Sequence, residues 1–273
     1  ALDHIDLDSA TRNNITVTSI PNILTNAVAE HAISLMMSLN KKIPELGGES
    51  GIRTAFFSDL QSFSTISEQL SSTELVNLLN EFLSSQTEII INHKGTLDKY
   101  EGDAILSFFG APMFFEDHSK AALDTGIYCQ KNLRNLNKKW ESEGDKWPEI
   151  VSTMKMRIGI NSGEMVTGNM GSKHHMNYTM MGDTVNLTAR LESGAKQYGI
   201  ETQVGSKIYE VTKDRFTYRM LDYAVVKGRT EPERTFELIS EKGKEPELYK
   251  KLIPVWDKAI KLYTEQKWDD AIK

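Results

Sequence analysis

The sequence has almost no cysteine. Cys129 is the only cysteine among 273 residues, so the chain cannot form an internal disulfide. Disulfides are typical of secreted proteins, and a chain without one fits a reducing compartment. We therefore expect a cytoplasmic location for this part of the protein.

Long hydrophobic runs are also missing. No apolar stretch reaches the ~18 residues needed to cross a bilayer, and the N-terminus lacks a basic region followed by an apolar core. We expect a chain without a membrane segment of its own, although a longer protein could carry an anchor elsewhere.

The chain has no excess of positive charge. It carries 38 acidic and 32 basic residues, a formal net charge of -6. A nucleic-acid surface is therefore not expected, whereas a nucleoside triphosphate would need only local positive charge. The length is sufficient for one large domain with a buried core.

Two acidic residues stand at the ends of short β-prone runs. Asp103 follows Gly102 in residues 95–109 (GTLDKYEGDAILSFF), which reads as a tight hairpin, and Asp59 ends the run 54–60 (TAFFSDL). If these strands are neighbours, the two carboxylates meet, and like charges so close favour a bound cation. Carboxylate oxygens favour magnesium or manganese. Taken singly, each is equally well an ordinary turn aspartate.

Three separated motifs, FFSDLQSF, KYEGDAILSFFGAP and YTMMGDTVNLTARLE, together resemble the catalytic domain of class III nucleotidyl cyclases. The resemblance covers about residues 53–239, and we place the domain at 53–240. It implies an α+β fold of the ferredoxin-like type, an antiparallel sheet with packed helices. The alternation of strands and helices along the chain agrees with an α+β sandwich.

By this resemblance, Asp59, Asp103 and the backbone carbonyl of Leu60 would bind two Mg²⁺ or Mn²⁺ ions per site. Asn186 would orient the ribose and Arg190 would stabilise charge on the α-phosphate. The spacing alone shows only that these two residues share a helical face, and without the resemblance that pattern favours an exposed polar stripe.

The resemblance also assigns substrate contacts. Lys227 and Arg157 would contact phosphates, while Lys99 and Thr179 would read the base. Threonine in this position resembles the subgroup called class IIIb, in which bicarbonate often stimulates activity. A hydroxyl group can donate as well as accept, so it discriminates bases less sharply than a carboxylate.

The resemblance therefore implies an adenylyl cyclase that converts ATP to 3′,5′-cyclic AMP and pyrophosphate. In this family the site lies between two protomers, so a homodimer is expected. One protomer would supply Asp59 and Asp103, and its partner would supply Lys99, Thr179, Asn186, Arg190 and Lys227. Two alternatives stay open: a cyclase for GTP or a pyrimidine triphosphate, and a catalytically silent dimerisation or nucleotide-sensing module.

The segments before and after residues 53–240 do not resemble the cyclase family. Residues 1–46 resemble a fragment of a D-isomer-specific 2-hydroxyacid dehydrogenase, but no G-x-G-x-x-G turn follows, so we expect a helical lead-in without dehydrogenase activity. Residues 47–52 read as a linker. The tail, 241–273, has helical spacing and looks like the start of tetratricopeptide-type repeats.

Apolar spacing and caps predict the elements inside the domain. We expect helices over about 72–93, 117–140, 184–198 and 207–212, and further strands at 154–161, 201–204, 216–226 and 234–239. Residues 141–148 read as a loop insertion and 162–182 as a strand arm.

Overall fold

The fold is described from a computed structural model, in which residues 12, 47–172, 175–224 and 233–272 are described. The chain divides into two units, and the second, Gly47–Lys273, holds all of the described sheet. The predictions for residues 1–46 and for Lys227 lie outside the described residues. No helix in the described ranges is long and apolar enough to cross a membrane.

The described part of the second unit contains one eight-stranded sheet with the order β2-β3-β1-β4-β6-β8-β7, and β5 pairs with β4 beside this path. In chain order the strands are β1 (Gly47–Leu60), β2 (Gly95–Glu101), β3 (Ala104–Phe109), β4 (Met156–Ser172), β5 (His175–Met181), β6 (Thr202–Gly205), β7 (Phe216–Ala224) and β8 (Glu233–Glu241). All strand pairs are antiparallel except β4–β6, which is parallel. The sheet is therefore mixed, where the sequence predicted an antiparallel one.

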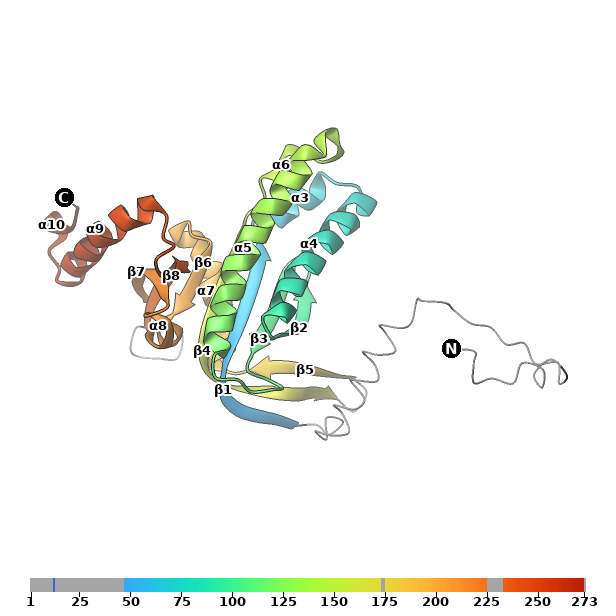
Figure 1. Cartoon of the computed structure of the whole chain (residues 1–273), viewed down its shortest axis with the longest axis horizontal. Coiled ribbons are helices and arrows are strands. Elements are labelled where there is room, and N and C mark those ends of the chain that lie inside the picture. The colour runs from blue at the N-terminus through green and yellow to red at the C-terminus, as the bar shows by residue number, and fades with distance from the viewer. Residues whose placement is uncertain (1–11, 13–46, 173–174, 225–232, 273) are drawn as a thin grey trace. The chain divides into compact units, whose positions relative to one another are not determined.

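The helices have the following bounds: α3 (Phe63–Glu68), α4 (Ser72–Asn92), α5 (His118–Ser142), α6 (Glu149–Ser152), α7 (Asp183–Tyr198), α8 (Ser206–Thr212), α9 (Glu247–Thr264) and α10 (Trp268–Ile272). Figure 1 shows the two long helices, α4 and α5, lying side by side along the sheet. Ser71 caps α4 and forms a capping box with Glu74, which satisfies backbone donors that the first turn leaves free.

Helices α5 and α7 lie on opposite faces of β4. A side chain at Gly126 of α5 would meet Ile160, whereas one at Gly159 would collide with the backbone of α7 at Thr188 and Glu192. Since successive strand residues point to opposite faces, the two helices cover different sides. The α+β fold with packed helices that the sequence predicted is confirmed.

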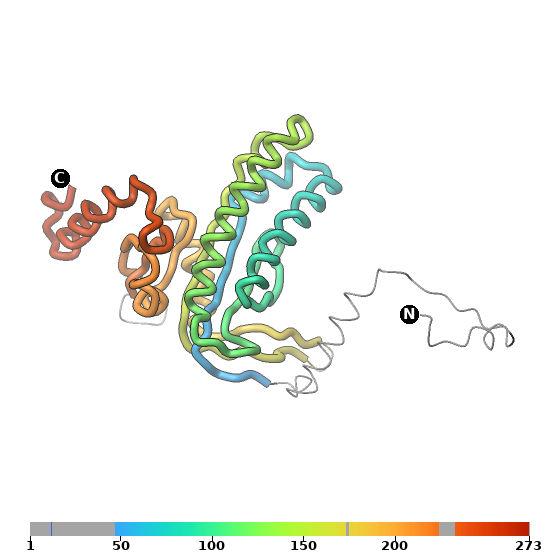
Figure 2. Tube along the Cα trace, viewed as in Figure 1, coloured from blue at the N-terminus to red at the C-terminus, as the bar shows by residue number. Residues whose placement is uncertain are grey.

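The main core lies between the sheet and the pair α4–α5. It includes Phe56, Phe82, Phe109 and Trp140, all essentially buried. A second, smaller cluster on the other face contains Ala55, Phe108, Ala111, Met165 and Met180, with Phe57 and Leu106 packed against it. The tube in Figure 2 shows β4 and β5 extending as an arm away from the long helices.

Three segments differ from the sequence predictions. Residues 47–52 are the first part of β1, not a linker, because their backbone pairs with β4 from Gly47 opposite Asn169 onward. The polar stretch after Asp59 forms the short helix α3, which was not predicted. The predicted loop at 141–148 contains the end of α5 and a 3₁₀ turn at Gly144–Lys146.

Candidate active site

The strands place Asp59 and Asp103 next to each other. In the register of β1 and β3, Ser58 lies opposite Ile105, so Asp59 and Asp103 both lie at this end of the pair. Gly102 permits the turn before Asp103 because its φ is +67°, a conformation that residues with a side chain rarely adopt. Burial, and then the charge of Asp59, raise the pKa of Asp103 to about 6.

This pair fits a hard divalent cation. Magnesium is usually held by one or two carboxylates together with substrate phosphates, not by a complete protein cage. Among the described residues no group of three or more His, Cys, Asp or Glu residues converges on a point, so the pair alone would fill only part of the coordination sphere of an ion. The Leu60 amide donates to Asp103 Oδ2 at 3.1 Å, which fixes one carboxylate; its carbonyl as a ligand stays a prediction.

Arg157 lies directly opposite Asp59 on β4. Its Nη2 is 3.1 Å from Asp59 Oδ2 and its Nε is 2.8 Å from Glu192 Oε1, and its side chain is only 13% exposed. Gly159 makes this possible, since the absence of a side chain lets α7 approach β4 closely. Arg157 thus neutralises Asp59, and the predicted phosphate contact requires it to leave that carboxylate.

Glu192 is a site neighbour that sequence reasoning did not single out. Burial raises its pKa, although the Arg157 guanidinium opposes the shift. Its only sequence signal was its place two residues after Arg190 in the motif TARLE.

Asn186 and Arg190 lie one turn apart on α7, and both side chains are exposed. The opposite side of the helix is anchored by buried Leu187, Thr188 and Leu191. Arg190 makes no ion pair with any described residue, so its guanidinium is available for an anionic ligand. The arrangement agrees with the predicted roles but leaves them as predictions.

Lys99 and Thr179 are brought together through a third residue, Asp98. Thr179 Oγ1 donates to Asp98 Oδ2 at 2.5 Å, and Lys99 Nζ is 3.5 Å from Asp98 Oδ1. The Asp98 side chain is 2% exposed, whereas that of Lys99 is 39% exposed. Sequence reasoning missed Asp98, which stands immediately before Lys99 in the motif LDKYEGD.

Among the described predicted residues, Arg157 is the one that forms an ion pair with the carboxylates. In the described ranges no hydrogen bond or ion pair joins Asp59 or Asp103 to Lys99, Thr179, Asn186 or Arg190. A cavity of about 700 Å³ lies where α5 begins and α8 packs, lined in part by His118, Ser162 and Lys207, but its lining includes none of these predicted residues.

Comparisons with known proteins identify the family. The family model described as "Adenylate and Guanylate cyclase catalytic domain" matches residues 49–240, well over half of the chain. The chain belongs to this family. The family is in general dependent on divalent metal ions. The match begins at residue 49, so the dehydrogenase resemblance of residues 1–46 gains no support from it and stays a prediction.

Individual relatives include curated adenylate cyclases. Adenylate cyclase 1 of Rhizobium meliloti is 30% identical over 86% of this chain, and the adenylate cyclase of Anabaena cylindrica is 27% identical over 80%. The chain spans 35% and 41% of their respective lengths.

Among solved structures, the adenylyl cyclase CyaB from P. aeruginosa superposes with a TM-score of 0.65 at 30% identity, covering 74% of this chain and 100% of that one. The guanylyl cyclase Cya2 superposes with a TM-score of 0.62 at 32% identity, covering 73% and 97%. Because an adenylyl and a guanylyl cyclase match about equally well, overall similarity does not select the base.

Proposed function

We propose that this domain is an adenylyl cyclase that converts ATP to 3′,5′-cyclic AMP and pyrophosphate at a site shared by two copies of the chain. The observation that carries the proposal is the Asp59–Asp103 pair. The two carboxylates are adjacent and the pKa of Asp103 is raised to about 6, while Arg157 pairs with Asp59 alone. A divalent cation bound between them would stabilise both charges and would supply the chemistry that a triphosphate substrate needs.

The chain's own residues would act by positioning and by charge. Asp59 and Asp103 would hold two Mg²⁺ or Mn²⁺ ions, which supply activation of the ribose 3′-hydroxyl and neutralisation of the triphosphate. Asn186 would fix the ribose, and Arg190 would stabilise negative charge that develops on the α-phosphate. Lys227 would bind the terminal phosphates, and Arg157 would make a further phosphate contact.

Sharing between protomers is supported by the lack of direct contact, in the described ranges, between the two carboxylates and Lys99, Thr179, Asn186 or Arg190. Arg190 is exposed and makes no ion pair with the carboxylates in the described ranges. A second copy would supply Lys99, Thr179, Asn186, Arg190 and Lys227 to the carboxylates of the first. A single chain would then be inactive.

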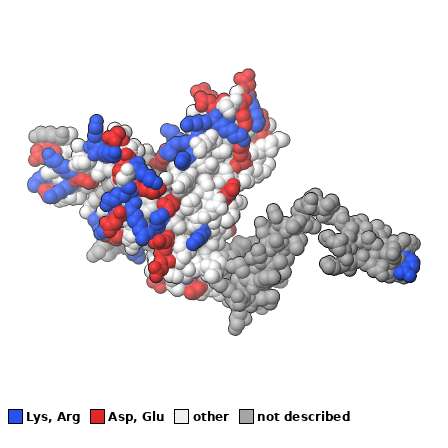
Figure 3. All heavy atoms as spheres, in the orientation of Figure 1, with Lys and Arg blue, Asp and Glu red and all other residues white. Residues whose placement is uncertain are grey.

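Charge on the face shown in Figure 3 is compatible with a small anionic substrate. Lys, Arg, Asp and Glu side chains are interspersed there, without a broad basic patch of the kind that nucleic-acid binding requires. Stimulation by bicarbonate rests only on Thr179 and stays a prediction.

The test is a product assay. We expect the protein, incubated with ATP and Mn²⁺, to form 3′,5′-cyclic AMP, and to form much less cyclic product from GTP, CTP or UTP, each identified by mass and retention time. The Asp59→Ala variant is the control for a contaminating cyclase and should form none. Cyclic GMP or a cyclic pyrimidine nucleotide as the main product would favour the alternative base; no product at all would favour a silent module.

A further inference from the structure

A buried carboxylate links the two residues proposed to read the base. We propose that Asp98 sets base selectivity, by fixing the Thr179 hydroxyl as a hydrogen-bond acceptor toward the substrate and holding Lys99 as the donor beside it. The inference rests on the proposed cyclase function, and it assigns the substrate class as a purine with an exocyclic amino group at C6, adenine and not guanine.

The hydrogen bond of the Thr179 hydroxyl has a fixed direction. A hydroxyl has one hydrogen to donate and two lone pairs to accept with, whereas a carboxylate only accepts. Thr179 donates its hydrogen to Asp98 Oδ2 at 2.5 Å. Its oxygen is then left with lone pairs alone, so it accepts from an amino group and cannot donate to a carbonyl.

Asp98 also lies close to Lys99. The other oxygen of Asp98, Oδ1, is buried and makes no hydrogen bond with any described residue, yet it lies 3.5 Å from Lys99 Nζ. A buried acceptor left without a hydrogen bond is uncommon and calls for an explanation. Attraction to the Lys99 ammonium explains this unpaired oxygen, because the attraction keeps the long, flexible lysine side chain next to Thr179.

An acceptor beside a donor matches one purine. Adenine presents an amino group at C6 and an unprotonated ring nitrogen next to it, so Thr179 would accept and Lys99 would donate. Guanine presents a carbonyl oxygen and a ring N–H at the same two places. With guanine, Thr179 would place an acceptor against the carbonyl oxygen and Lys99 would place a donor against the ring N–H. Sites built on such contacts reject the mismatched ligand strongly.

A β-bulge in β2 places Asp98 and Lys99 in these positions. The register of β2 and β3 shifts between Leu97 and Lys99, so Asp98 is an extra residue in the strand. Leu97 packs against the main core, but Lys99 lies opposite Leu106, which packs against the second cluster. Without the bulge, Leu97 and Lys99 would face the same side. The extra residue therefore turns Lys99 away from the main core and toward the face of the second cluster.

The test is Asp98→Asn, which keeps the shape of the side chain. An amide can donate to Thr179, which frees the hydroxyl to donate in turn to a guanine carbonyl. We expect the ratio of kcat/KM for ATP to that for GTP to fall at least tenfold, with kcat/KM for GTP rising in absolute terms. A residue that merely joined β2 to β5 would lower both values together, and that result, with the ratio unchanged, would overturn the proposal.

Two controls keep the outcome decisive. In a Thr179→Val background no hydroxyl remains to be oriented, so adding Asp98→Asn should leave the ATP:GTP ratio unchanged. If Asp98→Asn alone does not fold, as judged by circular dichroism, Thr179→Val serves instead: it should cost ATP at least ten times more than GTP, and an equal loss would contradict the proposal.

The proposed function and this inference fail in different ways. A wild-type protein that forms no cyclic product from any nucleotide refutes the function. A wild-type protein that prefers GTP leaves the cyclase class intact and refutes the role of Asp98. The difference in melting temperature with excess ATP and with excess GTP gives a second readout that is independent of turnover, because a ligand that binds the folded protein more tightly stabilises it more.

Discussion

The Asp103 carboxyl group has an environment that favours its neutral form. It is half-buried and close to the charge of Asp59, and the backbone amides that donate to it, Leu60 among them, oppose this only in part, so its pKa rises to about 6. The folded state therefore binds this proton more tightly than the unfolded chain does. Ionisation of Asp103 costs stability as the pH rises from about 4 to 6, and the cost is fully present above pH 6.

We therefore expect Asp103→Asn to melt at a higher temperature than the wild type at pH 8 in the presence of a chelator, with a smaller difference at pH 5. Added Mn²⁺ should raise the melting temperature of the wild type but have little effect on the variant. Glu101→Gln, a change of an exposed acid in the same hairpin, is the control and should alter neither result. A variant less stable than the wild type at pH 8 would show that the carboxylates do not repel each other as described.

At the residue scale, the sequence predicted the strand-end carboxylates because β-propensity and a turn glycine are local signals. It could not predict the contact of Arg157 with Asp59 and Glu192, since that contact depends on strand register and on the close approach of α7 at Gly159. Asp98 was missed because a β-bulge has no clear sequence signature here.

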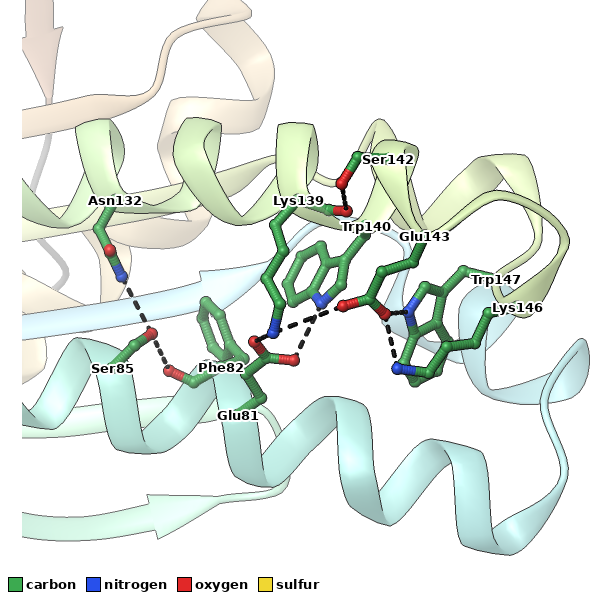
Figure 4. Close-up of polar contacts among 10 residues, drawn as sticks. All are labelled: Glu81, Phe82, Ser85, Asn132, Lys139, Trp140, Ser142, Glu143, Lys146 and Trp147. Carbon is green, nitrogen blue, oxygen red and sulfur yellow. Dashed lines mark hydrogen bonds and ion pairs between the residues drawn. The ribbon is translucent and has the colours of Figure 1, made fainter.

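At the element scale, α4 and α5 are joined by a row of polar contacts at the edge of the core, shown in Figure 4. The indole of Trp140 donates to Glu81 Oε2 at 3.2 Å while its ring is buried, and Lys139 pairs with the same carboxylate from the solvent side. Further along, the Trp147 indole donates to Glu143 at 2.7 Å. The buried rings supply most of the stabilisation, since exposed ion pairs contribute little.

Replacing Trp140 tests this division. Trp140→Ala should lower the free energy of unfolding by about 3–5 kcal/mol, because it leaves a cavity between α5 and the core. Lys139→Ala, the matched control on the same glutamate, should leave the midpoint of urea unfolding nearly unchanged. Equal effects of the two substitutions would mean that the polar row, and not the buried ring, holds the helices together.

The sequence predicted these helices well, because apolar spacing and the Ser71–Glu74 cap are local. The sequence prediction was wrong where the structure of a segment depends on a distant strand. Gly47 to Ile52 look like a linker by composition, but β4 supplies their hydrogen bonds. The parallel β4–β6 pair was equally invisible, since parallel and antiparallel neighbours do not differ reliably in a single sequence.

At the scale of the whole molecule, the proposal depends on two copies completing each other's site. In the described ranges, Asp59 and Asp103 make no direct hydrogen bond or ion pair with Lys99, Thr179, Asn186 or Arg190, although Arg157 links Asp59 to Glu192 of α7. Two copies related by a twofold axis would form two equivalent sites, each with Asp59 from one protomer and Arg190 from its partner.

The most direct measurement mixes two inactive variants, Asp59→Ala and Arg190→Ala, in equal amounts under conditions in which subunits exchange. Random pairing makes about half of the dimers mixed, and in each of these both lesions fall in one site. We expect recovery to about a quarter of the wild-type rate of cyclic AMP formation. As a control, the double variant mixed equally with wild type should halve the activity of that wild-type protein, because every mixed dimer then carries one lesion in each site. A mixture of the single variants that stays inactive, although gel filtration of size-tagged chains shows that subunits exchanged, would contradict the shared site.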